Sequence, residues 1–251
     1  MPATPAWPPH SLPRLFVDQA LSAGEVLTLE GSPANYLGNV LRLKAGDGVK
    51  LFDDRTGEWL ARIEEAGRKR VTLSITGRLR PRDTVPDLWL LFAPLKRAQT
   101  DWLVEKATEL GVARLVPVLT RRTGAERVNL DRLRGIAVEA AEQCDRTMLP
   151  DIAEPVKLAT LLGAWPSDRA LLFADETGGQ PLAEAASPPP AAILIGPEGG
   201  FTNEERALIG GLPAATAVAL GPRILRAETA ALAALSLWMA AAGDWQRPPR
   251  G

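Results

Sequence analysis

The sequence predicts an α/β domain with a mostly parallel sheet, preceded by a small β-barrel domain. Three observations lead to this prediction. Residues 14–80 contain short apolar segments, about ten residues apart, with glycine-marked turns between them. From Leu88 onward, continuous apolar strands alternate with helical patterns, which is typical of a parallel sheet covered on both faces. A polar, proline-marked linker at residues 81–87 separates the two patterns.

The first domain, residues 14–80, is expected to contain strands at 14–17, 25–29, 49–52, 59–63 and 71–75. One helix is expected at residues 32–43, with Leu37, Val40 and Leu41 facing the core. Short strands at this spacing favour a small barrel. The proline-rich residues 1–13 are expected to form a mobile leader.

The second domain, residues 88–246, is expected to contain strands at 88–93, 115–119, 170–174, 191–195 and 217–220. Helices are expected at 99–110, 130–144, 203–209 and 227–242, and residues 247–251 form a short tail. The last helix is apolar nearly all round, so it must be buried in the domain or against a second subunit. Four tryptophans with apolar neighbours are expected in the cores: Trp59, Trp89, Trp102 and Trp238.

Composition excludes several classes of protein. With 46% apolar and 24% charged residues, the chain can bury a core. It has no uncharged apolar stretch long enough to span a membrane, and no basic region followed by an apolar run that would indicate a signal peptide. The expected compartment is therefore the cytoplasm.

The one histidine and the one cysteine limit the possible chemistry. His10 lies in the leader, and Cys144 has no base beside it. This excludes Ser-His-Asp and Cys-His catalysis and sites built from several histidines or cysteines, so no metal is expected. Any catalysis must use carboxylates, arginine, lysine, backbone amides or an organic cofactor.

The net charge of −1 does not by itself indicate a nucleic-acid partner. A group of arginines between residues 114 and 134 has two interpretations. It is either a solvated, salt-bridged surface or a local cluster that binds phosphates.

The first motif with chemical content runs from Ile193 to Glu205 and reads ILIGPEGGFTNEE. A buried strand ends in a glycine-rich loop, and Thr202 with Glu205 form a capping box that starts the next helix. Ligands collect at the carboxyl ends of strands in open α/β sheets. The glycine spacing matches neither a dinucleotide fingerprint nor a Walker loop. The alternative is a tight turn with no ligand.

The second motif, ALGPRILRAETA, runs from Ala219 to Ala230. A strand again leaves through Gly-Pro into a helix, with Arg226 and Glu228 at the junction. These two side chains are either a surface pair of little energetic value or groups that act on a phosphate or a base.

Taken together, the two motifs resemble the paired cofactor loops of the RsmE-type 16S rRNA uridine-N3 methyltransferases of the SPOUT superfamily. Further stretches are similar to that family: Leu95-Lys96, EKATELGV from Glu105, EAAEQCDR from Glu139, and NVLRLK from Asn39 with Gly46-Asp47. The resemblance covers about residues 14–243. In one departure, Asn35 and Tyr36 stand where the family often has a histidine, so one of them would have to replace its RNA contact.

The resemblance implies a PUA-like β-barrel joined to an α/β trefoil-knot (SPOUT) domain that acts as a homodimer and uses S-adenosyl-L-methionine (SAM). Cofactor contacts are then expected at the residues of the two loops and at neighbouring positions: Ala174, Gly196, Pro197, Glu198, Gly199, Gly200, Leu220, Gly221, Ile224, Leu225 and Thr229.

The expected substrate is 16S rRNA in the small ribosomal subunit. The candidate RNA contacts are all basic: Arg14, Arg42, Lys44, Lys96, Arg97, Arg121, Arg122, Arg146 and Arg223. In catalysis, Arg226 is expected to stabilise negative charge on the uracil, and Glu198 or Glu228 to accept its N3 proton. Two alternatives remain open: a non-catalytic RNA-binding or ribosome-assembly factor, and a SPOUT enzyme acting on another RNA, at a tRNA or a ribose 2′-hydroxyl.

Overall fold

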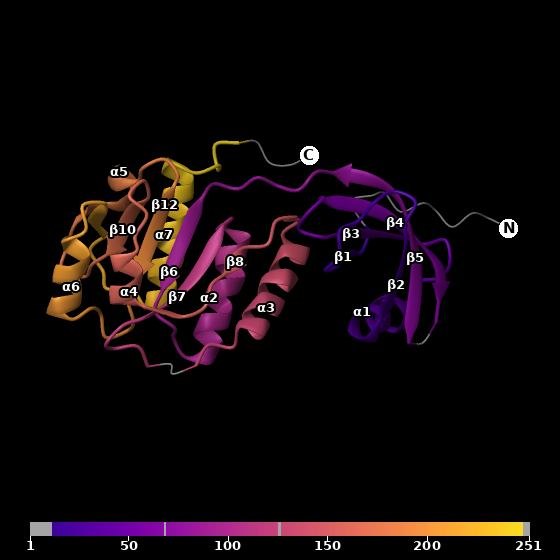
Figure 1. The fold of residues 1–251 in the computed structure, drawn as a ribbon, viewed down its shortest axis with the longest axis horizontal. Helices are drawn as coiled ribbons and strands as arrows, with labels where there is room; N and C mark the ends of the chain where they lie inside the picture. The colour runs from indigo at the N-terminus through magenta and orange to yellow at the C-terminus, as the bar shows by residue number, and fades with distance from the viewer. Residues whose placement is uncertain (1–11, 68, 125–126, 248–251) are drawn as a thin grey trace. The chain divides into compact units, whose positions relative to one another are not determined.

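The computed structural model describes residues 12–67, 69–124 and 127–247, which form two compact units (Figure 1). The N-terminal unit comprises the chain up to Thr84 together with Asp145–Met148. The C-terminal unit comprises Val85–Cys144 and the chain from Leu149 onward. Most of the expected leader, with His10, and most of the expected tail lie outside the described residues.

The N-terminal unit is built on a five-stranded sheet in the order β1-β3-β4-β5-β2. The first pair is parallel and the others are antiparallel. In sheet order the strands are Arg14–Phe16, Gly48–Phe52, Glu58–Ala66, Arg70–Arg80 and Val26–Glu30. Alternating side chains of these strands form the core, which gives the sequence the two-residue period of a strand. This period predicted all five strands to within a few residues, except that β5 extends well beyond the predicted end at residue 75.

The helix expected at residues 32–43 is split into two parts. The α-helix α1 (Gly31–Asn35) continues into a π-helical turn, η2 (Tyr36–Val40), in which the Leu41 amide donates to the Tyr36 carbonyl at 2.9 Å. It ends at Val40, and Arg42, two residues later, has a left-handed φ of 56°. Leu37 is fully buried and Val40 is 61% exposed, so the expected core position of Val40 is wrong. The wider turn rotates Val40 away from the helix face that Leu37 buries.

The C-terminal unit contains an eight-stranded parallel sheet in the order β11-β13-β10-β12-β6-β7-β8, with β9 also paired to β7. The central strands are β13 (Ala215–Ala219), β10 (Ala170–Ala174), β12 (Ala191–Ile195), β6 (Leu88–Phe92) and β7 (Arg114–Leu119). The outer ones are β8 (Asp151–Ile152), β9 (Val156–Lys157) and β11 (Gln180–Pro181). The sequence patterns predicted the five central strands, whereas the two-residue outer strands have too few side chains to show a period.

Helices cover both faces of this sheet (Figure 1). Leu88, Leu90 and Phe92 of β6 pack on one side, and Leu91 packs on the other. The first side is covered by α2 (Arg97–Glu109), α3 (Leu130–Gln143), α5 (Leu182–Ala185) and α7 (Ala227–Ala241). The second side is covered by α4 (Leu158–Gly163) and α6 (Asn203–Gly210). Burial on both faces explains why the central strands read as continuous apolar runs.

Trp59 and Trp238 are buried, as expected, and Trp89 is partly buried with the guanidinium groups of Arg114 and Arg169 over its ring. Trp102 was expected in the core but is 41% exposed on α2. Its apolar neighbours Leu103 and Val104 occupy the buried face of the helix instead.

Among the described residues, no helix has the length and apolar character needed to cross a membrane.

Candidate functional site

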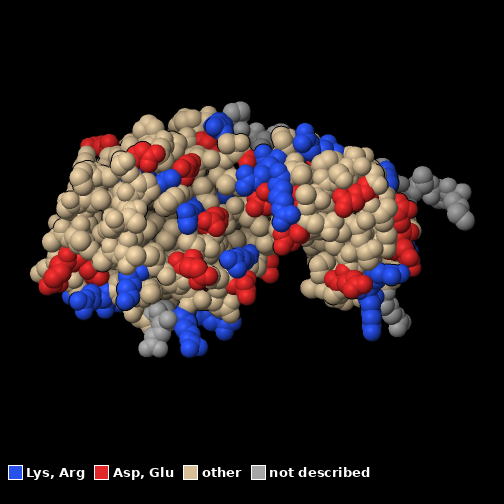
Figure 2. Space-filling model, viewed as in Figure 1, with Lys and Arg blue, Asp and Glu red and all other residues tan. Residues whose placement is uncertain are grey.

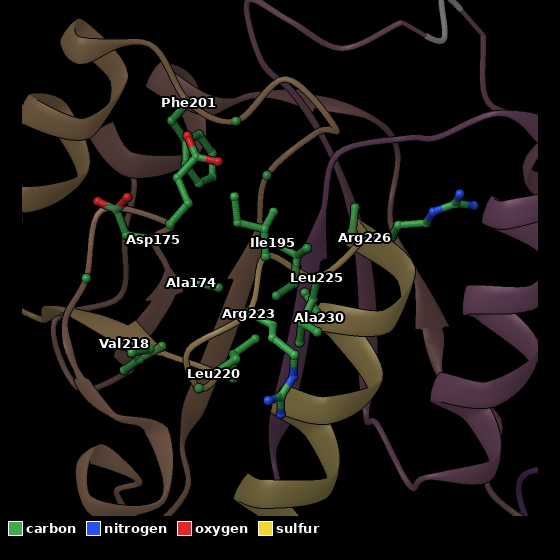
Figure 3. Close-up of a pocket in the computed structure, with 18 of the residues that line it drawn as sticks. Ala174, Asp175, Ile195, Phe201, Val218, Leu220, Arg223, Leu225, Arg226 and Ala230 are labelled. Carbon is green, nitrogen blue, oxygen red and sulfur yellow. The ribbon is translucent and has the colours of Figure 1, made fainter.

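A cavity of ≈ 490 Å³ lies where three neighbouring strands of the C-terminal unit end (Figure 3). Ala174 ends β10, Ile195 ends β12 and Ala219 ends β13, and all three line the cavity. Because parallel strands present their carboxyl ends at one edge of the sheet, the sequence brings the loops that follow them together. We call this space the cofactor cavity.

The loop after β12 forms one wall of the cofactor cavity and is held by the start of α6. The Thr202 hydroxyl accepts from the Glu205 amide at 3.2 Å, and the Glu205 carboxylate accepts from the Thr202 amide at 2.9 Å. This is the capping box that the sequence predicted. Glu205 is buried and its second oxygen accepts from the Arg121 amide at 2.7 Å. One carboxylate therefore joins this loop to the loop after β7.

The same loop accommodates side chains poorly at two of its glycines. Gly200 has a left-handed φ of +67°, and a Cβ there would lie 2.8 Å from Oε1 of Glu176. A Cβ on Gly196 would lie 3.0 Å from the Phe201 ring. Backbone groups thus form this wall of the cavity, which allows a ligand to approach the main chain closely.

The loop after β13 forms the opposite wall. Gly221 turns the chain with a φ of +99°, and Arg226 is the N-cap residue of α7. In Figure 3 the Arg226 side chain points away from the other labelled residues, on the side opposite Asp175. Ile224 is 89% exposed although it lines the cavity.

Acidic residues that sequence reasoning missed lie at the end of β10. Asp175 and Glu176 line the cofactor cavity and pair with Arg206 of α6, at 3.3 Å and 2.8 Å. The sequence contained a usable signal, because both residues directly follow a buried strand whose carboxyl end faces the site. Their charges are balanced by Arg206 at the rim.

Most of the expected cofactor contacts do line this cavity: Ala174, Gly196, Pro197, Glu198, Gly200, Leu220, Gly221, Ile224 and Leu225. Thr229 does not line it and is exposed on the first turn of α7. Gly199 faces a second cavity, next to this one. Of the candidate catalytic residues, Arg226 and Glu198 line the cofactor cavity. Glu228 does not, and its Oε2 atom is buried without a hydrogen-bond partner among the described residues.

The second cavity has a volume of ≈ 570 Å³ and lies at the carboxyl ends of β6 and β7, beside the loop after β12. Pro197 and Glu198 line both cavities. Within the second one, Asp101 forms an ion pair with Arg132. Burial raises the pKa of the Asp101 carboxyl, and the positive charge of Arg97 opposes this rise.

The candidate RNA contacts are dispersed. Lys96, Arg97 and Arg122 line the second cavity, and Arg223 lines the cofactor cavity. Arg121 is exposed beside the loop that Glu205 holds, and Arg42 and Lys44 are exposed in the N-terminal unit.

Arg14 and Arg146, two of the expected RNA contacts, are buried in the N-terminal unit and so are not accessible to RNA. The Arg14 guanidinium bonds to Glu58 at 2.5 Å and to the Arg146 carbonyl at 2.7 Å, and lies 3.8 Å from the centre of the Phe52 ring. These groups hold Arg14 inside the unit, so it stabilises the fold. No cluster of metal-binding side chains occurs within the described parts of the chain.

Comparison with known proteins gives the family. An RNA methyltransferase domain model matches residues 82–239, and an RNA methyltransferase PUA domain model matches residues 29–76. The chain belongs to the RNA methyltransferase family. Its fold is that of a SPOUT methyltransferase domain preceded by a PUA-like domain.

Relatives extend over nearly the whole chain. The ribosomal RNA small subunit methyltransferase E of Rickettsia conorii is 31% identical over 89% of this chain and 93% of its own length. That of Synechocystis is 33% identical over 89% and 76%. A Neisseria gonorrhoeae structure of that enzyme bound to S-adenosyl methionine has a TM-score of 0.86 at 27% identity, covering 93% of this chain and 99% of that one. A putative methyltransferase from Legionella pneumophila in complex with SAM has a TM-score of 0.83 at 31% identity, covering 93% and 99%.

Proposed function

We propose that this RNA methyltransferase uses SAM to methylate N3 of a uridine in 16S rRNA of the small ribosomal subunit, in the cytoplasm. The observation that carries the proposal is the cofactor cavity between two glycine loops at the carboxyl edge of a parallel sheet. It agrees with the SAM-bound neighbour and with the names of the relatives above.

The residues of the cofactor cavity fit SAM. Its volume of ≈ 490 Å³ falls within the range of about 300–1,000 Å³ that small-molecule sites occupy. Apolar side chains, among them Ile195, Val218 and Leu220, suit an adenine ring, while the glycine loops offer backbone donors and acceptors. When bound, SAM supplies a methyl group activated by a sulfonium. The protein must then hold the uracil and manage one proton.

Glu198 is the proposed proton acceptor. The uracil N3–H must lose its proton to become nucleophilic, and an exposed carboxylate within reach can take it. Glu198 lines both cavities, whereas Glu228 lines neither. Arg226, at the mouth of the cofactor cavity, is proposed to stabilise the negative charge that develops on the uracil carbonyl oxygens.

The target nucleotide has to be unpaired when it reacts. N3 lies on the base-pairing edge of uracil, so it is inaccessible within a duplex. The exposed Arg42 and Lys44 of the PUA-like unit are proposed to contact the surrounding rRNA, with Tyr36, which is 40% exposed, near them in sequence. Asn35 bonds to Asn39 at 2.8 Å, so Tyr36 is the more available replacement for the family's histidine.

We also propose that the chain acts as a homodimer. On α2 and α7, which pack together, Trp102 is 41% exposed and Leu237 is 38% exposed. If these side chains belong to one apolar patch, pairing with a second copy of the chain would remove it from water. Sedimentation of Leu237→Glu is expected to give a monomer. Leu208→Glu is the matched control, because Leu208 is 44% exposed on α6, across the sheet, and this variant should remain dimeric. A native chain that sediments as a monomer would contradict the proposal.

The methylation proposal is tested in two steps. Titration calorimetry measures SAM binding to the native chain and to Gly196→Arg, which is expected to lose it because a Cβ at this position in the cofactor cavity already lies 3.0 Å from the Phe201 ring. Small ribosomal subunits lacking the modification are then treated with enzyme and SAM. A methyl group on N3 blocks base pairing, so primer extension is expected to stop at one uridine.

Glu198→Gln should remove that stop while SAM binding persists. Binding of SAM without methylation of any small subunit would favour a different RNA substrate. A folded native chain that does not bind SAM would overturn the proposal and favour the non-catalytic RNA-binding role.

A further inference from the structure

The second cavity is separate from the cofactor cavity but is built from the same edge of the sheet. The sheet order β10-β12-β6-β7 puts the cofactor cavity over β10 and β12 and the second cavity over β6 and β7. The loop after β12 separates them, with Pro197 and Glu198 facing both sides. A ligand in the second cavity would therefore lie directly beside a ligand in the first.

The second cavity is strongly basic. Its lining includes five cationic side chains: Lys96, Arg97, Arg122, Arg127 and Arg132. The two carboxylates that share the lining are Asp101 and Glu198. Figure 2 shows basic and acidic side chains interspersed along the lower edge of the C-terminal unit. The excess of positive charge is thus a property of the residues that line this cavity.

Three of these cations, Lys96, Arg97 and Arg127, are available to a ligand, and the first two lie together at the start of α2. Arg132 is neutralised by Asp101, and Arg122 donates to the Gly199 carbonyl. Lys96 and Arg97 are exposed and form no ion pair with any described residue. They also begin α2, whose N-cap residue Lys96 makes no side-chain cap and whose first turn contains no acidic residue. The positive end of that helix adds to their attraction for an anion.

The rest of the lining is apolar or neutral. Leu95 and Pro94 precede α2, Val128 precedes α3, and Thr100 is buried in α2. The cavity thus combines an anion site at the start of α2, apolar side chains, and the Glu198 carboxylate at the border with the cofactor cavity. A nucleotide offers a group for each of these: an anionic phosphate for the cations, the apolar faces of its base for the apolar side chains, and the N3–H edge of that base for the carboxylate.

We propose that the second cavity receives the target nucleotide itself, with its 5′-phosphate on Lys96 and Arg97 and its uracil against Glu198. This rests on the proposed function, because it supplies the substrate subsite for the same reaction. Binding of a whole nucleotide in a cavity requires that it leave the RNA stack, as N3 chemistry demands. Arg122 is a positioning residue in this arrangement, since it connects the second cavity to the Gly199 peptide of the cofactor loop.

The test uses the full chain saturated with SAM. Calorimetry measures the affinity for uridine 5′-monophosphate and for uridine, and steady-state kinetics measures KM for unmodified small subunits. The native enzyme is expected to bind the monophosphate at least about tenfold more tightly than the nucleoside, because a charge-assisted phosphate contact contributes that much. That preference should weaken as salt is added.

The double variant K96Q/R97Q is expected to lose the preference for the monophosphate. Its KM for small subunits should rise about tenfold or more, with a smaller salt dependence and an unchanged Kd for SAM. R134Q is the matched control, because Arg134 is an exposed arginine of α3 that pairs with Asp131 and does not line the cavity. It should behave as the native enzyme does.

The two proposals fail in different ways. If K96Q/R97Q binds SAM and methylates small subunits with native KM, the cavity is not the nucleotide site, although the proposed function stands. The same conclusion follows if R134Q and K96Q/R97Q raise KM equally. If the native chain neither binds SAM nor methylates, the proposed function itself is wrong.

Discussion

Gly200 is the residue of the cofactor loop at which a single methyl group should have the largest effect. Its left-handed φ of +67° costs an L-residue about 1–2 kcal/mol. The new Cβ would also displace Glu176, which pairs with Arg206. Gly200→Ala is therefore expected to weaken SAM binding by about tenfold, measured by titration calorimetry.

Gly210→Ala provides the control for this prediction. Gly210 lies at the end of α6, and nothing is within 4 Å of a Cβ placed there. Alanine suits a helix better than glycine does, so this variant should be as stable as the native chain and bind SAM equally well. Equal SAM affinity in both variants would show that the Gly200 backbone is not part of the cofactor site.

For single residues, the sequence indicated which ones lie near a strand end more reliably than it indicated whether a side chain is buried or which way it faces. Gly196, Gly200 and Glu198 lie at the cofactor cavity because motif spacing fixes their positions relative to strand ends. Arg14 looked equally suitable as an RNA contact, but it is buried and bonds to Glu58, which is 44 positions away in the sequence. No local pattern shows such a pairing. Thr229 points outside the cavity because helical rotation, not sequence distance, decides where it faces.

At the scale of elements, Asp53 holds the turn that follows β3. Its carboxylate accepts from the amides of Arg55 and Thr56, from the Thr56 hydroxyl and from the Leu21 amide. Burial raises the pKa of Asp53, but these hydrogen bonds outweigh it and bring the pKa below its usual 3.8. The ionised form therefore stabilises the fold fully above the unfolded pKa, and this contribution is lost as the pH falls through about 4 and below.

Asp53→Asn is expected to lower the free energy of unfolding of the N-terminal unit at pH 7 by about 1–3 kcal/mol, because an amide cannot accept all of these bonds. The difference from the native chain should shrink between pH 5 and pH 3, as followed by urea unfolding. Glu58 is protonated at low pH in both the native chain and the variant. The variant therefore still loses stability in acid, although less than the native chain does. Asp18→Asn serves as control, because its side chain is 84% exposed in a surface ion pair. A native-like stability of Asp53→Asn at both pH values would contradict the prediction.

Long, periodic elements were predicted well and short ones were not. The strand β12 and the start of α7 lie where the apolar runs placed them, because packing on both faces of the sheet and a long apolar helix leave strong patterns. The six-residue α4 and four-residue α5 were missed, since one turn of helix has no measurable period. The π-turn at Tyr36 was also missed, because the residues that bury Leu37 come from other strands.

At the scale of the whole molecule, the sheet order produced the main surprise. Chain order places β6 first and β13 last, yet β12 lies beside β6 and β10 lies beside β13. Sequence patterns show which strands exist but not which ones pair. The adjacency of the two cavities depends on this order. The sequence also does not show that Asp145–Met148 belong to the N-terminal unit. In the structure, the backbone amide of each of Thr147 and Asp83 donates to the side chain of the other at 2.8 Å.

The division into two units leads to a prediction about how SAM stabilises the chain. All residues of the cofactor cavity belong to the C-terminal unit. A ligand at 100 times its Kd stabilises the unit that binds it by about 2.7 kcal/mol, which corresponds to a rise in Tm of roughly 5–10 °C for a unit of this size. Scanning calorimetry with SAM should therefore raise one transition and leave that of the N-terminal unit unchanged. Gly200→Ala should show a smaller rise at the same SAM concentration. Equal shifts of both transitions, or a single transition that moves as a whole, would instead mean that the two units unfold cooperatively.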